Sequence, residues 1–410
     1  MAGRASPGRY SARAWVIRLA LAGSVAWIGY LSVVNSLAIA LPHSELERAH
    51  ALAPNNAQIT ARLSEALSVP EANSADRTRA ADLARDALRR DATTVEAAAT
   101  LGLDAAIRGD GPAAEDMFGY AQFLSRRNLA TQLWAIEVAV ERGDVAGALK
   151  HYDIALRTKT NAPELLYPVL VSAAADPNIR IELIKTLAAK PLWADSFVHY
   201  AARNSADPKS MAELFGGLKR ANFEIPTAAS KTLIDALLAG ENYAEAWSYY
   251  SALRPGAKPQ MSRDPDFGTM PETALAFDWV AKNTVGISTA IQPGAKSGIF
   301  DFAVSPSVSG VLLQQLQMLP QGDYVLEGRS LGLDQPSGSR PYWTLSCRRG
   351  GRELGRLEVA NSSQDGGKFT GPFTVPADCP LQVLALVARS SNAMAGVTGQ
   401  IDRAQLRPAR

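Results

Sequence analysis

The feature that most constrains the fold is a 34-residue repeat within residues 95–156. Small and aromatic residues of one unit return 34 positions later (114 to 148): Ala114, Phe118, Ala121, and then Ala148, Tyr152, Ala155. A Gly-Asp pair precedes each segment with the same spacing and predicts a turn there, at Gly109-Asp110 and Gly143-Asp144. Two antiparallel helices approach within about 8–10 Å only where the crossing side chains are small. The repeat therefore predicts helical hairpins, with Gly102 as a further small packing residue.

This period, with small residues at the crossing and an aromatic residue one turn later, resembles the tetratricopeptide repeat (TPR). The resemblance implies stacked hairpins, because a single hairpin leaves one apolar face bare. Ala80, Ala84 and Ala87 carry the register one unit earlier, with alanine at 84 where the family usually has an aromatic residue. Helical spacing continues beyond residue 158 without the strict pattern. We therefore expect an all-α, TPR-like solenoid over residues 42–253 that binds an envelope protein partner.

The N-terminal segment has the composition of a membrane anchor. Residues 19–41 carry no charge and, at about 1.5 Å per helical residue, are long enough to span a hydrocarbon core of about 30 Å. Residues 1–18 contain no acid but several arginines: Arg4, Arg9, Arg13 and Arg18. The positive-inside rule then predicts a cytoplasmic tail (1–18), a transmembrane anchor (19–41) and an exported remainder. A cleaved signal peptide is the alternative, since Ala38-Ile39-Ala40 has the A-x-A pattern of a cleavage site.

An all-β region is expected after a Pro/Gly-rich linker at residues 254–276, in which the dense helix and strand breakers exclude regular elements. From residue 277 the pattern alternates, as in Trp343, Leu345 and Cys347 against their polar neighbours. Residues 315–318 and 324–329 alternate on either side of a turn at 320–323 and predict a β-hairpin. The short strands of residues 277–410 together predict a β-sandwich of the jelly-roll type.

This last region resembles carbohydrate-binding jelly rolls. The resemblance rests on short motifs: Phe277-Asp278-Trp279, Phe300-Asp301-Phe302, Pro320-x-Gly322-x-Tyr324 and Gly399-Gln400-Ile401-Asp402. Sugar sites use Trp or Tyr rings as stacking platforms, with polar groups that fix orientation. Tyr342 is the candidate platform because alternation places it opposite Trp343, and Arg340 and Arg348 are near in sequence. The alternative is that the aromatic residues only fill the core.

Cys347 and Cys379 are the two cysteines of the chain. Both belong to the region expected to be exported, and no third cysteine competes, so a disulfide between them is predicted. Two separately buried thiols are the alternative.

No catalytic signature is present in the sequence. It lacks GxSxG, HExxH, CxxC and a phosphate-binding glycine loop, and its four histidines have no metal-spaced companions. We expect no enzyme activity, cofactor or metal, and the net charge of +2 offers no basic field for nucleic acid. The alternative is a jelly-roll glycoside hydrolase or lyase, which needs two carboxylates about 5–10 Å apart. Four acids are candidates for such a pair: Asp301, Glu327, Asp334 and Asp402.

The two resemblances together imply a non-catalytic scaffold of a bacterial polysaccharide assembly or secretion system. The solenoid would bind a partner protein, and the sandwich would contact glycan or protein. The implied location is the inner membrane, crossed once, with the bulk of the chain in the periplasm. A periplasmic chaperone-like assembly factor is a further alternative, and the identity of the partner or glycan and the oligomeric state stay open.

Overall fold

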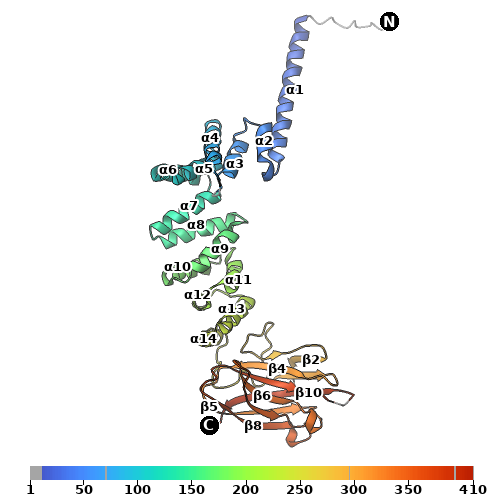
Figure 1. The fold of residues 1–410 in the computed structure, drawn as a ribbon. Coiled ribbons are helices and arrows are strands. Elements are labelled where there is room, and N and C mark those ends of the chain that lie inside the picture. The colour runs from blue at the N-terminus through green and yellow to red at the C-terminus, as the bar shows by residue number, and fades with distance from the viewer. Residues whose placement is uncertain (1–11, 70–71, 295, 392–393, 410) are drawn as a thin grey trace, which may run out of the picture. The chain divides into compact units, whose positions relative to one another are not determined.

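The computed structural model describes residues 12–69, 72–294, 296–391 and 394–409 (Figure 1). The chain divides into two compact units, residues 1–162 and 163–410. Helices make up the first unit, and the second combines further helices with the strands. The fold class is therefore as predicted: an N-terminal apolar helix, an all-α region and a C-terminal all-β sandwich.

Helix α1 (Ala12–Ala40) carries the predicted anchor. An 18-residue window within residues 13–40 has a mean hydropathy of 1.6, and α1 is the one helix in the described ranges that is long and apolar enough to cross a membrane. Of the predicted cytoplasmic tail, residues 1–11 lie outside the described residues, while residues 12–18 belong to the helix. Such a helix is compatible with a single-pass membrane protein or a secreted one.

The C-terminal end of α1 is attached to the first short helices, α2 (Leu46–Leu52) and α3 (Ala57–Leu67). Ala38 is buried against Ala49 and Ile59, and the side-chain amide of Asn56 donates to the side-chain oxygen (Oδ1) of Asn35 at 2.7 Å. These contacts require the last turns of α1 to lie among protein residues.

The remaining helices of the first unit are η1 (His43–Glu45), α4 (Ser74–Arg90), α5 (Val95–Ile107), α6 (Gly111–Leu124), α7 (Leu129–Glu141) and α8 (Val145–Thr158). Helix α3 packs with α4, α5 with α6 and α7 with α8. Gly109 and Gly143 have positive φ angles of 76° and 68° in the turns, a conformation that glycine adopts without strain. Asp110 and Asp144 follow and cap α6 and α8 through their side-chain oxygens. The Gly-Asp pairs therefore end one helix and start the next.

The predicted repeat-packing residues are all buried: Gly102, Ala114, Phe118, Ala121, Ala148, Tyr152 and Ala155. A Cβ atom on Gly102 would lie 2.9 Å from the Phe118 ring, so this crossing requires glycine. Phe118 also stacks on Trp134 of α7, with ring centroids 4.8 Å apart. This ring therefore packs both within its hairpin and against the next one.

Further helices precede the strands in the second unit. They are α9 (Ala162–Ala173), α10 (Pro177–Ala188), α11 (Ala194–Asn204), α12 (Pro208–Arg220), α13 (Thr227–Ala239) and α14 (Tyr243–Leu253). Asp176 and Asp207 cap α10 and α12, each with a proline in the first turn, where the missing N–H costs no hydrogen bond.

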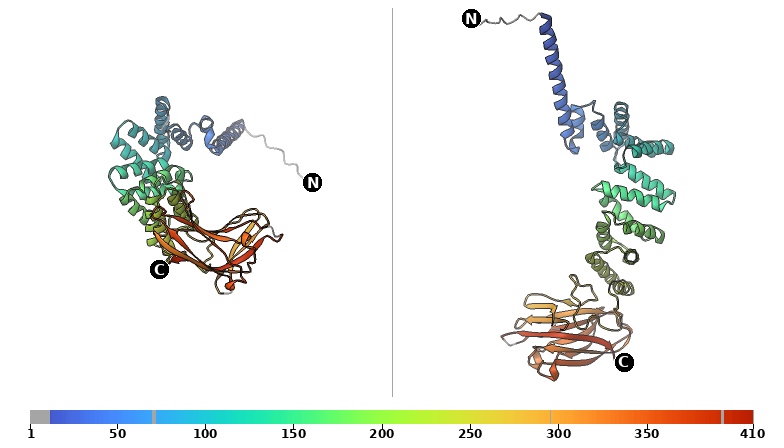
Figure 2. Two further views of the ribbon diagram at one scale, coloured as in Figure 1. Left: turned by 60° about the horizontal axis from the view of Figure 1, so that its bottom comes forward. Right: turned by 180° about the vertical axis from the view of Figure 1, so that it is seen from behind.

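The sandwich consists of two antiparallel five-stranded sheets, seen as separate layers in Figure 2. The first sheet has the order β1-β4-β9-β6-β7, from β1 (Val280–Ala281), β4 (Gly310–Gln317), β9 (Gln382–Ala388), β6 (Tyr342–Cys347) and β7 (Glu353–Glu358). The second has the order β2-β3-β10-β5-β8, from β2 (Ile287–Pro293), β3 (Gly298–Val304), β10 (Val397–Pro408), β5 (Gly322–Leu331) and β8 (Lys368–Val375). Short 3-10 turns, η2 (Ser337–Ser339) and η3 (Asp365–Gly367), lie in the connections.

The predicted hairpin at residues 315–329 is wrong. Its two halves are β4 and β5, which belong to different sheets: β4 pairs with β1 and β9, and β5 pairs with β8 and β10. Alternation fixes which face of a strand is buried, but a turn of this length can equally connect two packed sheets. The segment therefore crosses from one sheet of the sandwich to the other.

The core lies between the sheets, and alternation identified its members correctly. Tyr324 and Leu326 of β5 point inward, as do Trp343 and Leu345 of β6. Four further aromatic side chains fill the same core: Phe300, Phe302, Phe369 and Phe373.

The Pro/Gly-rich linker contains no helix or strand, yet it is bonded to the sandwich. Ser262 exchanges hydrogen bonds with the Leu406 backbone, and the Ala404 N–H donates to the Pro265 carbonyl at 2.8 Å. Phe267 is fully buried in the sandwich core. The linker thus supplies hydrogen-bond partners to the backbone of β10 beyond Ile401, where the pairing of β10 with β3 ends.

Gly298 marks the closest approach of the linker to β3. Its N–H donates to the Asp266 carbonyl at 3.0 Å, and a Cβ atom there would lie 1.7 Å from the Phe267 carbonyl oxygen. We expect Gly298→Ala to lower the free energy of unfolding by about 1–3 kcal/mol, since the backbone must shift. Chemical denaturation measures the change. Gly338→Ala is the matched control, because open space surrounds that position; equal stability of the two variants would contradict the prediction.

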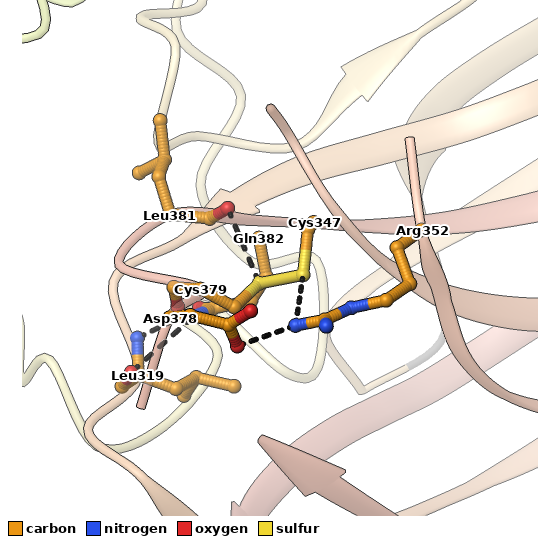
Figure 3. The surroundings of a disulfide bond; sticks show 7 residues. All are labelled: Leu319, Cys347, Arg352, Asp378, Cys379, Leu381 and Gln382. Carbon is orange, nitrogen blue, oxygen red and sulfur yellow. Dashed lines mark hydrogen bonds and ion pairs between the residues drawn. A yellow bond between two sulfur atoms is a disulfide. The ribbon is translucent and has the colours of Figure 1, made fainter. Parts of the chain in front are cut away.

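The predicted disulfide between Cys347 and Cys379 is present, with Cα atoms 5.6 Å apart (Figure 3). It joins the end of β6 to the turn before β9. Arg352 lies beside it, donating to the Cys347 sulfur at 3.8 Å and pairing with Asp378 at 2.5 Å. The guanidinium of Arg352, hydrogen-bonded to Asp378, lowers the pKa of that carboxyl.

Candidate functional site

A groove of about 1370 Å³ lies on the second sheet of the sandwich. Strands β3, β5, β8 and β10 supply most of its lining, and Asp266 and the β2–β3 turn supply the rest. The outward positions of β5 and β8 contribute Glu327, Arg329, Lys368 and Thr370. These side chains stand on hydrogen-bonded strands, so the groove has a rigid base.

A β-bulge sets the geometry at the centre of the groove. The β10–β5 register shifts between Ile401 and Arg403, so Asp402 is the extra residue. A bulge re-aims side chains locally, and here the Asp402 carboxylate accepts from the Arg329 Nε at 2.9 and 3.0 Å. The bulge thus fixes an arginine and a carboxylate side by side in the groove.

Each carboxylate that lines the groove has an arginine partner. Besides Asp402 with Arg329, Asp266 pairs with Arg403 at 2.6 Å. Glu327 pairs with Arg407 at 2.9 Å. The hydrogen bond from the Arg407 guanidinium lowers the pKa of the Glu327 carboxyl.

This pairing determines what the groove can do chemically. A glycosidase general acid needs a raised pKa, produced by burial or by a neighbouring like charge, and Glu327 has the opposite shift. The remaining candidates for an acid pair lie elsewhere: Asp301 accepts from Gln292 at 3.0 Å, and Asp334 accepts from Asn361 at 3.3 Å. Within the described ranges, no three His, Cys, Asp or Glu residues are grouped so as to hold a metal ion. The groove is therefore equipped for polar binding through charge-assisted hydrogen bonds.

Tyr342 lies on the other sheet, on the outward face of β6 and half-buried, opposite Trp343 as alternation predicts. The Arg356 guanidinium lies 4.1 Å and that of Arg389 4.9 Å from the centre of its ring. Arg389 also pairs with Glu358, the cross-strand neighbour of Tyr342, at 2.5 Å. Guanidinium groups thus occupy space over the ring that a stacking sugar would need.

The structure does not bring Arg340 and Arg348 together at Tyr342. Arg340 is half-buried, and its Nε donates to the Gln335 carbonyl at 3.4 Å. Arg348 is exposed just beyond the last residue of β6. Six residues at about 3.3 Å each place it about 20 Å along the strand from Tyr342.

Sequence reasoning missed most of the groove. Glu327 and Asp402 were recognised only as acids that could form a catalytic pair, and Lys296, Lys368 and Arg403 were not singled out. The available signal was the polar, outward half of each alternating strand. This signal does not single out a binding site, because most outward positions in a sandwich are polar and exposed to solvent.

No protein family matches this sequence, and the search of curated proteins found no match. Among solved structures, the chain is similar to the CBM22-1 xylan-binding domain of Xyn10C from Paenibacillus barcinonensis. The identity is 15% and the TM-score 0.24, over 36% of this chain and 94% of that domain. That bacterial domain is named for binding xylan, whereas the sandwich of the present chain is defined by its own two sheets.

Proposed function

We propose that this protein is a membrane-anchored, non-catalytic component of the bacterial envelope whose β-sandwich binds a glycan in the groove on its second sheet. The observation that carries the proposal is the groove itself, in which paired arginine and carboxylate side chains stand on rigid strands. Such groups exchange hydrogen bonds with water for bonds to sugar hydroxyls at little cost in reorganisation.

The rest of the chain supports a scaffold role in the same proposal. The 34-residue register and its buried small residues support a TPR-like solenoid, a class of fold that presents extended binding surfaces to partner proteins. Helix α1 supports a single inner-membrane anchor, and the disulfide supports export of the bulk to the periplasm. The solenoid would then hold a protein of a polysaccharide assembly or secretion system near the glycan.

The arginine partners of Asp266, Glu327 and Asp402 favour binding over hydrolysis. A carboxyl group with a lowered pKa, as Glu327 has, is poorly suited to give a proton to a leaving glycosidic oxygen. The pairing thus supports the proposal of binding in this groove over the enzyme alternative.

The test is calorimetric titration of the full chain in detergent micelles with a panel of envelope polysaccharides. We expect weak binding without release of reducing ends. Arg329→Gln should weaken it about ten- to hundredfold, in line with about 1.5–3 kcal/mol for a hydrogen bond to a charged group. Release of reducing ends would overturn the non-catalytic assignment.

Tyr342→Ala is the matched variant on the opposite sheet. If the groove is the site, the Tyr342→Ala variant should bind the glycan with unchanged affinity. If the Tyr342 ring is the stacking platform, the variant should lose about 1–2 kcal/mol of binding free energy. A loss in Tyr342→Ala with no loss in Arg329→Gln would transfer the site to the first sheet. No binding to any glycan would reject the proposed function.

A further inference from the structure

We propose that the ligand of the groove is an acidic polysaccharide, whose carboxylate groups are bound by a row of basic side chains that crosses three strands. This inference rests on the proposed function, because it names the class of glycan that the same groove takes.

The basic row is defined by strand register. Lys368 of β8 is the cross-strand partner of Arg329 of β5, and Arg329 is the partner of Arg403 of β10. All three line the groove. Neighbouring strands are about 4.8 Å apart, so three cations follow one another at close spacing across the sheet.

Like charges directly opposite each other on paired strands destabilise a sheet unless counter-charges lie near them. In this row Asp402 balances Arg329 and Asp266 balances Arg403, whereas Lys368 makes no ion pair within the described part of the chain. A negatively charged ligand at Lys368 would supply the missing counter-charge.

The internal ion pairs leave a positive excess in the groove. Arg329 is paired with Asp402, Arg403 with Asp266, and Glu327 with Arg407. Lys296 and Lys368 also line the groove and make no ion pair within the described part of the chain. Two ammonium groups are therefore available to carboxylates of a ligand.

The apolar part of the lining favours a polysaccharide over an acidic polypeptide. The side chains of Ile299 and Leu331 are half-buried and contribute to the groove beside the cations. A uronic acid presents a C–H face and a carboxylate on the same ring, so one residue can use both kinds of contact. A ring-free poly-anion would use the charges alone.

The experiment compares full-length protein in detergent micelles with the double variant Lys296→Gln/Lys368→Gln. The matched control is Lys150→Gln/Lys258→Gln, which removes the same charge at exposed positions outside the groove. The probes are polygalacturonate, neutral dextran and polyglutamate, each titrated at low and high ionic strength. We expect polygalacturonate to bind best, to weaken with salt and to lose about five- to tenfold in affinity in the groove variant only.

Each other outcome overturns a defined part of the argument. Equal binding of dextran with no effect of the groove variant would reject the acidic ligand but keep glycan binding. Polyglutamate binding as tight as polygalacturonate would reject the commitment to a polysaccharide. An equal loss in the control variant would show that the loss follows overall charge and would reject the groove as the site of the acidic ligand. Binding of neither polysaccharide would reject the acidic ligand, and the proposed function would fall with it only if the panel of envelope polysaccharides also failed to bind.

Discussion

Replacing Cys347 and Cys379 together by alanine is expected to lower the free energy of unfolding of the sandwich by about 3–4 kcal/mol. The bond closes a loop with a sequence separation of 32 residues, and the chain-entropy model gives about this value for such a loop. Both cysteines are buried, and the bond connects β6 to the turn before β9 in the first sheet. Loss of the bond therefore removes a constraint on β9, which is the central strand of that sheet.

Denaturant unfolding followed by tryptophan fluorescence measures this change, since Trp343 is fully buried four residues before Cys347. Reductant provides the control: it should shift the midpoint of the natural protein to that of the double variant and leave the variant unchanged. Identical midpoints for oxidised and reduced natural protein would show that the bond contributes nothing to stability.

Asp278→Ala is expected to destabilise the junction of α14 and the sandwich by about 3–5 kcal/mol, the range for removing one partner of a buried ion pair. The Asp278 side chain is 3% exposed and pairs with Arg254 at 3.1 Å and also with Arg263. It further accepts from the Tyr250 hydroxyl at 2.8 Å and from the Leu275 N–H at 3.1 Å. Removing it leaves two largely buried arginines facing each other without a counter-charge.

Tyr250→Phe separates the hydrogen bond from the charge at this junction. Burial, and then the adjacent Asp278 carboxylate, raise the pKa of the Tyr250 hydroxyl, so it stays protonated as a donor. The phenylalanine variant keeps the ring, which packs on Phe277 with centroids 5.1 Å apart, and should cost about 1.5–3 kcal/mol.

Limited proteolysis within residues 254–279, combined with denaturant unfolding, tests both changes. Asp278→Ala should open this segment to cleavage more than Tyr250→Phe does. Equal protection of the natural protein and Asp278→Ala would show that the carboxylate does not hold the junction.

The sequence by itself determined the elements whose cause is local. The spacing of small residues at 114 and 148, and the Gly-Asp turns before them, specify helical hairpins because a helix repeats every 3.6 residues along its own chain. Alternation likewise identified Trp343 and Leu345 as inward residues of one strand, because the side-chain period of a strand is two. The disulfide followed from there being two cysteines in one domain.

Only the tertiary structure decided which strands pair and which polar residues meet. Residues 315–329 look like one hairpin, yet β4 and β5 join different sheets, because pairing depends on how the whole sandwich closes. For the same reason Lys368, Arg329 and Arg403 form a row although they are distant in sequence, and Asp278 meets Arg254 and Arg263 across an apparent linker. Local periodicity sets the faces of each element, whereas register between distant elements is set by the packing of the complete domain.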